Sequence, residues 1–268
     1  MIVRVIPATL LVLGLVFLSE APATTEAAVP DVFEDHRVTI DDGGHPVEFR
    51  YRLLRPDVSE PDGSHPVVLF LHGAGERGND NESQLKFLPL WMAEPENRKR
   101  HPCFLIAPQC RTDSAWAKID WKSKQPLPLA ERPTADLAAA AAALDTVLAE
   151  ESADPARVYL TGLSMGGYGT WDLACRSPDR FAAALPICGG GDRAAAAGLT
   201  AMPLWCFHGG DDPVVPVELS RSMIEAIVAA GGAPIYSELP GVGHDSWTPA
   251  YRNPAVLDWL FAQRRRRP

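Results

Sequence analysis

This sequence of 268 residues contains few cysteines, has no excess of positive charge and has few long apolar runs. Five cysteines without a C-x-x-C pair are too few for a disulfide scaffold, and their odd number leaves at least one unpaired. No histidine stands at a metal-binding spacing from any of them, so we expect no structural metal. The five are Cys103, Cys110, Cys175, Cys188 and Cys206.

The charge balance is acidic, with a formal net charge of −9 and a sequence pI near 5.3. This deficit of positive charge argues against general binding to nucleic acid or to an anionic membrane surface. The one basic block, Arg264–Arg267, stands at the end of the sequence. We expect it to be a solvated tail, with a surface anchor as the alternative.

The N-terminal apolar run is too short for a membrane span, which needs about 20 residues. It covers residues 5–18, follows the positive charge of Arg4 and is interrupted by Pro7. Two polar residues and an A-x-A pattern at residues 21–23 come next, which predicts a secretory signal peptide over residues 1–23. An uncleaved anchor is the alternative. We therefore expect an exported protein, periplasmic or secreted, with no stable membrane span after cleavage.

The rest of the chain shows no internal repeat and no linker strong enough to divide it. We expect a polar lead-in at residues 24–35, one α/β domain over residues 36–263 and the basic tail at residues 264–268. From His36, two alternating segments around a Gly-Gly turn predict an antiparallel hairpin. Further on, continuous apolar runs alternate with helical segments, which is typical of a mainly parallel sheet covered on both faces. The apolar runs are residues 67–71, 103–107, 157–162, 182–187, 203–207 and 234–239, and the helical segments outside the serine motif are residues 134–150, 218–232 and 254–264.

A serine stands among four glycines in the segment VYLTGLSMGGYGTW, residues 158–171. Gly162, Ser164 and Gly166 form G-x-S-x-G between an apolar strand and a helical segment. This is the context of a nucleophile elbow, in which the positions two before and two after the serine must lack side chains so that strand and helix can pack closely. We interpret Ser164 as a nucleophile; a glycine-rich turn with an incidental serine is the alternative.

A serine nucleophile needs a base, and on this type of fold the chain order is serine, acid, histidine. Only His208 and His244 follow Ser164. His208 precedes Asp211 and Asp212, so it cannot follow an acid at either position, and we expect it to order its own turn. His244 lies in a glycine-rich loop before the last helix, and we predict that it is the base.

Three aspartates compete for the role of the acid. Asp211 and Asp212 both lie in the loop after a buried strand, where a catalytic carboxylate belongs. We favour Asp212, which precedes a proline and an apolar run, and interpret Asp211 as a solvated or turn-capping group. Asp245 is the weaker candidate, because side chains adjacent in sequence to the base seldom point at it.

Acyl transfer also requires an oxyanion hole, made of two backbone amides near the developing negative charge. The residue after the nucleophile, Met165, is predicted to supply one. The second should come from the loop after an early strand, where residues 72–75 read His-Gly-Ala-Gly. We assign it to Ala74; a merely flexible turn is the alternative.

These motifs together resemble α/β-hydrolase esterases, most closely the bacterial carboxylesterase/phospholipase-like group related to feruloyl esterases and polyester depolymerases. The similar stretches are LHGAGERG, APQC, TGLSMGGYGTWDLA, PICGGGD, FHGGDDPVVP and GVGHDSW, spread over residues 67–260. The resemblance implies a three-layer α/β-hydrolase fold whose mainly parallel sheet carries the N-terminal antiparallel hairpin, without a large cap domain. It also implies a Ser–His–Asp esterase that uses no metal and no organic cofactor.

Tryptophans near these motifs are candidates for the wall of a substrate pocket. Trp116 and Trp121 lie in a long excursion, and Trp247 stands three residues after His244. Each could instead be a packing residue.

We therefore expect a carboxylic ester hydrolase that acts on a small-molecule or polymer-borne ester, such as an acyl or feruloyl ester of polysaccharide. A serine peptidase of the prolyl-oligopeptidase type shares the triad order, although its gating domain would not fit in this length. A hydrolase-like binding protein without catalysis is the non-enzymatic alternative.

Overall fold

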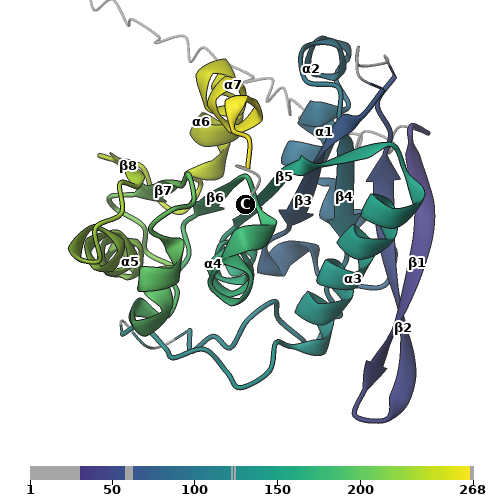
Figure 1. Ribbon diagram of the computed structural model, residues 1–268. Coiled ribbons are helices and arrows are strands. Elements are labelled where there is room, and N and C mark those ends of the chain that lie inside the picture. The colour runs from purple at the N-terminus through teal and green to yellow at the C-terminus, as the bar shows by residue number, and fades with distance from the viewer. Residues whose placement is uncertain (1–30, 58–62, 122, 124, 266–268) are drawn as a thin grey trace, which may run out of the picture.

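The protein is built around an eight-stranded sheet with the strand order β1-β2-β4-β3-β5-β6-β7-β8 (Figure 1). The computed structural model describes residues 31–57, 63–121, 123 and 125–265. The predicted signal peptide, residues 1–23, lies outside this range. The strands are β1 (Phe33–Asp42), β2 (His45–Leu54), β3 (His65–Leu71), β4 (Phe104–Pro108), β5 (Ala153–Leu163), β6 (Ala183–Ile187), β7 (Trp205–Gly209) and β8 (Ile235–Leu239).

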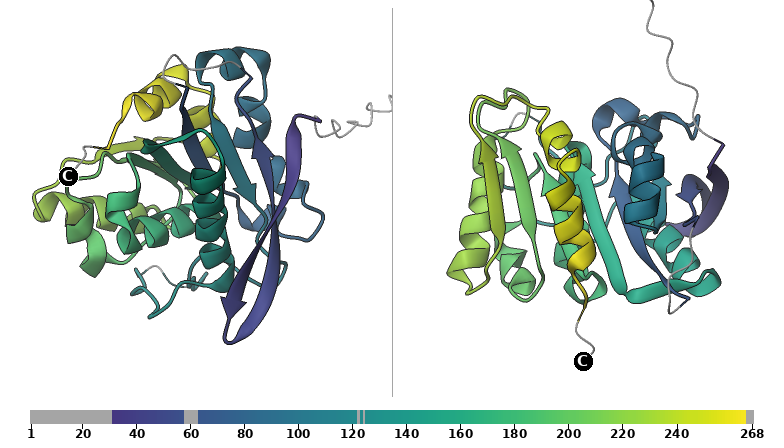
Figure 2. Two further views of the ribbon diagram at one scale, coloured as in Figure 1. Left: turned by 45° about the vertical axis from the view of Figure 1, so that its right-hand side comes forward. Right: turned by 90° about the horizontal axis from the view of Figure 1, so that it is seen from above.

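Strands β3 to β8 run parallel to one another, whereas β2 pairs antiparallel with both β1 and β4. The mainly parallel sheet with an N-terminal antiparallel hairpin confirms the predicted architecture. The hairpin extends beyond the other strands (Figures 1 and 2). Its turn uses Gly43 and Gly44 at φ values of +66° and +90°, which an L side chain rarely adopts. Strand β1 begins at Phe33, inside the segment predicted as lead-in.

Helices cover both faces of the sheet, because the parallel strands are apolar on both sides. Helices α3, α4 and α5 contribute to one buried cluster, and α1, α6 and α7 to the other. The α-helices are α1 (Leu88–Met92), α2 (Pro95–Arg100), α3 (Ala135–Glu150), α4 (Met165–Arg176), α5 (Val217–Ala229), α6 (Trp247–Tyr251) and α7 (Pro254–Ala262). The 3₁₀ helices are η1 (Ala74–Glu76), η2 (Ser83–Leu85), η3 (Pro178–Arg180) and η4 (Arg193–Leu199).

Local sequence explains where the longest helix begins. The Thr134 side chain accepts a hydrogen bond from the Leu137 amide, which satisfies one amide of the first turn of α3. The alanine-rich sequence that follows has high helix propensity. In the part of the chain that the structure describes, no helix is long and apolar enough to cross a membrane.

The five cysteines are all free thiols, and four of them are buried.

The start of the basic tail contacts the domain. Arg264 forms an ion pair with Asp154 at 2.8 Å, and the Arg265 amide donates to the Ala156 carbonyl. Both arginines remain exposed, and residues 266–268 of the predicted tail lie outside the described part of the chain.

Candidate active site

The predicted nucleophile lies at a sharp turn between β5 and α4. Ser164 has φ +53° and ψ −115°, a backbone conformation that costs energy in a residue with a side chain. Its amide donates to the Ile187 carbonyl at 2.9 Å, which fixes the turn against the neighbouring strand. Such strain persists only where the surrounding structure enforces it, and it is concentrated at functional sites.

Glycines make this turn sterically possible. A Cβ at Gly166 would lie 1.8 Å from the Leu71 carbonyl oxygen, and one at Gly162 would lie 2.5 Å from the Gly166 oxygen. At Gly167 the obstacle is the Ile187 oxygen, 2.2 Å away. Helix α4 therefore begins in direct backbone contact with the ends of β3 and β6, and only glycine fits there.

The structure brings the three predicted triad residues together from three different loops. The His244 Nε2 atom lies 2.9 Å from the Ser164 Oγ atom, and His244 Nδ1 lies 2.8 Å from Asp212 Oδ2. Ser164 follows β5, Asp212 follows β7 and His244 follows β8. Because the carboxyl ends of parallel strands meet at one edge of the sheet, these loops converge there.

The Asp212 carboxylate is fully enclosed and well supplied with donors. Its Oδ1 atom accepts hydrogen bonds from the Val214 and Val215 amides, and Oδ2 also lies 3.3 Å from His208 Nε2. Burial by itself would raise the pKa of Asp212, but the hydrogen bonds from both histidines and both amides outweigh it and hold the pKa well below its ordinary value. The carboxylate therefore stays ionised, and it fixes the His244 proton on Nδ1.

His208 has a supporting position in this arrangement. Its ring is fully buried, with Nδ1 2.7 Å from the Ser220 hydroxyl and Nε2 3.0 Å from the Val215 carbonyl. It therefore holds its own turn, as expected, and also places a donor beside Asp212. That second contact was not evident from sequence, because residues 208 and 212 are brought together by the tight turn after β7.

The loop after β3 is held by a buried histidine. The Cys110 amide donates to His72 Nε2 at 2.9 Å, so the neutral ring carries its proton on Nδ1, which donates to the Gly73 carbonyl at 2.6 Å. Burial lowers the pKa of His72 to about 4, which keeps the ring neutral. The Gly73 carbonyl and the Ala74 amide belong to one peptide group, so His72 orients the predicted oxyanion donor. Arg77 also holds this loop, because its Nε atom donates a hydrogen bond to the Ala74 carbonyl.

The other predicted donor, Met165, is the first residue of α4. Amides in the first turn of a helix have no acceptor within the helix, and they point toward its N-terminal end. The steric contact of Gly166 with the Leu71 and His72 carbonyls places this helix start beside the loop that carries Ala74.

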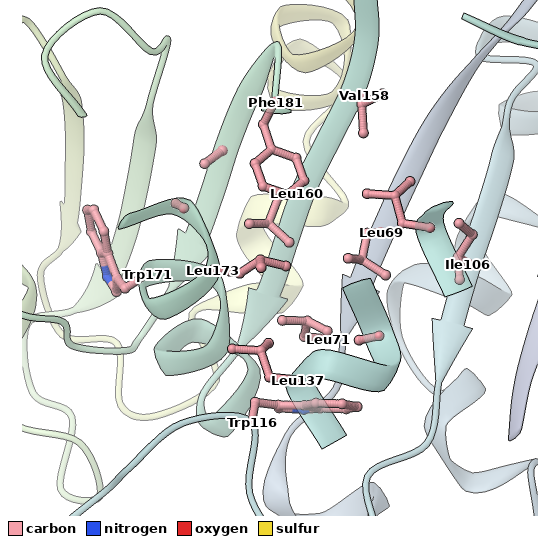
Figure 3. Packing of buried hydrophobic residues seen from close by; sticks show 14 of the residues in the cluster. Leu69, Leu71, Ile106, Trp116, Leu137, Val158, Leu160, Trp171, Leu173 and Phe181 are labelled. Atoms are coloured by element: carbon pink, nitrogen blue, oxygen red, sulfur yellow. The ribbon is translucent and has the colours of Figure 1, made fainter. Parts of the chain in front are cut away.

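The structure contradicts the predicted pocket role of Trp116. Its side chain is fully buried beside Leu71 and Leu137 (Figure 3), and its indole nitrogen donates to the His72 carbonyl at 2.9 Å. A Cβ at Gly169 would lie 2.5 Å from the Trp116 Cβ. This explains the fourth glycine of the cluster, since it makes room for a tryptophan that supports the loop after β3.

The other two tryptophans have different surroundings. Trp247 is half-buried and packs edge-on against His244, with ring centroids 5.2 Å apart, and against Phe87 at 5.4 Å. Trp121 is 46% exposed and lies 6.1 Å from the ring of Tyr168. Trp247 is therefore next to the predicted base, whereas Trp121 lies near α4.

A shallow, open hollow lies beside α4. Tyr168 and Asp172 of α4, Asp192, and residues within 117–120 and 125–129 contribute to its lining. None of the three triad residues lines it, although the Tyr168 amide donates to the Ser164 carbonyl, so the hollow begins one helical turn from the nucleophile.

Comparisons with known proteins agree with this fold. The model of the dienelactone hydrolase family matches residues 117–250, which is half of the chain and includes Ser164, Asp212 and His244. A protein named probable feruloyl esterase C from Aspergillus niger is 26% identical over 212 residues, which cover 78% of this chain and 72% of that protein.

Solved structures show the same architecture. A thermostable esterase superposes with a TM-score of 0.78 and 41% sequence identity, covering 88% of this chain. The chain spans only 64% of the length of that esterase. An acylaminoacyl peptidase from Pyrococcus horikoshii matches with a TM-score of 0.62 at 14% identity over 88% of this chain and 43% of the peptidase, which supports the fold alone.

Proposed function

Because this chain belongs to the dienelactone hydrolase family, we propose that it hydrolyses carboxylic esters through a Ser164–His244–Asp212 triad and an acyl-enzyme intermediate. The family and the esterase relatives make it a carboxylic ester hydrolase. One observation carries the assignment of the triad: a single imidazole lies within 2.9 Å of the Ser164 hydroxyl and 2.8 Å of an enclosed carboxylate.

The proposed reaction follows from the position of the protons. Asp212 keeps the His244 proton on Nδ1, so Nε2 has a free lone pair facing Ser164. Ser164 Oγ attacks the ester carbonyl while Nε2 takes its proton, and the amides of Ala74 and Met165 stabilise the oxyanion. Nε2 then protonates the leaving alcohol. Water repeats the same steps on the acyl-enzyme, which releases the acid and restores Ser164.

We extend the proposal to acyl or feruloyl esters carried on polysaccharide, acted on outside the cytoplasm. The resemblance to a protein named as a feruloyl esterase supports the substrate class, and Trp247 beside His244 offers an aromatic surface to an acyl or alcohol group. The export proposal depends on residues 1–23, which lie outside the described part of the chain.

Replacing the nucleophile tests the proposal directly. Ser164→Ala should lower kcat for p-nitrophenyl acetate by about 10⁴-fold or more, whereas the matched control Ser222→Ala should stay near wild type, because the Ser222 hydroxyl only donates to the Leu219 carbonyl on α5. A fluorophosphonate probe should label the wild type on Ser164. Near-normal turnover by Ser164→Ala, or labelling of that variant, would contradict the assignment.

A further inference from the structure

Three side chains of different chemistry meet next to the proposed nucleophile. The Cys188 Sγ atom, a carboxylate oxygen of Asp212 and a ring nitrogen of His244 all lie within 4.8 Å of one another. Cys188 follows β6, so the three come from the loops after three consecutive strands of the sheet. Cys188 also has φ +40°, an uncommon value for a residue with a side chain.

Thiolate, imidazole and carboxylate are the ligand types that Zn²⁺ and similar borderline-soft cations prefer. We propose that Cys188, Asp212 and His244 form an inhibitory binding site for a divalent cation such as Zn²⁺ or Cd²⁺. Bonds of about 2.0–2.3 Å place the ligand atoms of a tetrahedral zinc site about 3.5 Å apart. The thiol, within 4.8 Å of the other two ligand atoms, therefore needs to move inward by about 1 Å, and Asp212 Oδ2 and His244 Nδ1, now 2.8 Å apart, need to separate by about 0.7 Å. Solvent supplies the fourth ligand. The cation would reach the site from the side of His244, because the His244 side chain is 21% exposed whereas that of Asp212 is enclosed.

The existing hydrogen bonds allow this binding without unfolding the loop. Asp212 Oδ1 keeps its bonds to the Val214 and Val215 amides, and Oδ2 keeps its contact with His208 Nε2. Only the His244 N–H at Oδ2 has to be exchanged for the cation. A divalent charge then balances one thiolate and one carboxylate. Burial raises the pKa of the Cys188 thiol well above its ordinary value, so a bound cation has to stabilise the thiolate.

Binding changes the protonation of the proposed base. The cation takes the lone pair at His244 Nδ1, and the proton from that atom moves to Nε2; the thiol proton of Cys188 leaves to solvent. Nε2 then faces Ser164 as a donor and can no longer accept the hydroxyl proton. The expected consequence is a loss of hydrolysis that is reversed when the cation is removed.

Titration of the purified full chain with Cd²⁺ tests this site independently of activity. The wild type should develop an ultraviolet thiolate-to-cadmium charge-transfer band that saturates at one equivalent, together with a loss of ester hydrolysis that EDTA reverses. In Cys188→Ala the band should be absent. Half-inhibition of Cys188→Ala, measured against its own activity without Cd²⁺, should need about 10-fold more Cd²⁺ than half-inhibition of the wild type. Loss of a residue that only supports a metal ligand already lowers affinity by about 10-fold or more, and loss of a ligand should cost at least as much. Cys188→Ser gives the same test if the alanine variant does not fold.

Cys206→Ala is the matched control, because this thiol is also buried but contacts Ser220. It should behave as the wild type. A band that persists in both Cys188 variants, one that disappears in Cys206→Ala, or a wild type without a saturable band would overturn the proposal. Ser164→Ala should retain the band, so the metal site and the proposed esterase activity can fail separately.

Discussion

His72 should control the oxyanion hole through one hydrogen bond and the stability of the loop through another. The ring donates from Nδ1 to the Gly73 carbonyl and accepts at Nε2 from the Cys110 amide. Asparagine places its amide near the former Nδ1 and can keep the first bond. Glutamine reaches the former Nε2 and can keep the second. The two variants therefore separate the orientation of the Ala74 amide from the attachment of the loop to the strand end.

The expected losses of stability and of kcat follow from the burial of both hydrogen-bond partners of the His72 ring. Each variant removes one buried hydrogen bond, and in His72→Gln the Gly73 carbonyl keeps only the Glu76 amide at 3.3 Å, so each should lower the free energy of unfolding by about 1–3 kcal/mol. Removing an oxyanion donor altogether costs about 10²- to 10³-fold in kcat. His72→Gln loosens the donor peptide without deleting it, so we expect a loss of at least about 10-fold. His72→Asn should stay within a few-fold of wild type.

Steady-state kinetics with p-nitrophenyl acetate and urea unfolding of the same preparations provide the test. The loss in His72→Gln should appear in kcat, with KM little changed, because the oxyanion forms only during reaction. If both variants are equally stable and His72→Asn loses as much kcat as His72→Gln, the Gly73 bond does not orient the donor and the reasoning is wrong.

Three further predictions concern the acid, the elbow and pH. Asp212→Asn should lower kcat by about 10⁴-fold, whereas Asp211→Asn should change it by less than about 10-fold; a larger loss at 211 would reverse the assignment. Gly166→Ala should destabilise the protein by about 4 kcal/mol or more in urea unfolding, while Gly75→Ala, whose Cβ would meet nothing within 4 Å, should not. The unfolded chain takes up a proton on His72 near pH 6.5, whereas the native state does so only near pH 4, so about 3 kcal/mol of the stability present above pH 6.5 should be lost as the pH falls from 6.5 to 4. The loss should be smaller in His72→Asn; an identical pH dependence of the two proteins would contradict this.

Local sequence was sufficient to predict the sheet, the sharp turn at Ser164 and the three residues that the structure brings together there. Apolar runs marked the buried parallel strands, because such strands exclude polar residues on both faces. Glycines on both sides of Ser164 marked the elbow, because a Cβ there would collide with the backbone of β3. The choice between Asp212 and Asp211 was weaker, since the sequence alone does not show which of two adjacent carboxylates turns inward toward His244.

Contacts between distant loops could be seen only in the tertiary structure. The sequence makes Trp116 a candidate for the pocket wall, yet it is buried against Gly169 and its indole N–H donates to the His72 carbonyl. No sequence spacing links Cys188 to His244, because they approach only when the parallel strands bring their carboxyl ends to one edge. The sequence by itself thus determined which residues could do the chemistry, through local periodicity and steric demand. The order in which the strands pair in the sheet decided which of them meet and which support the loops, since that depends on neighbours far apart in the chain.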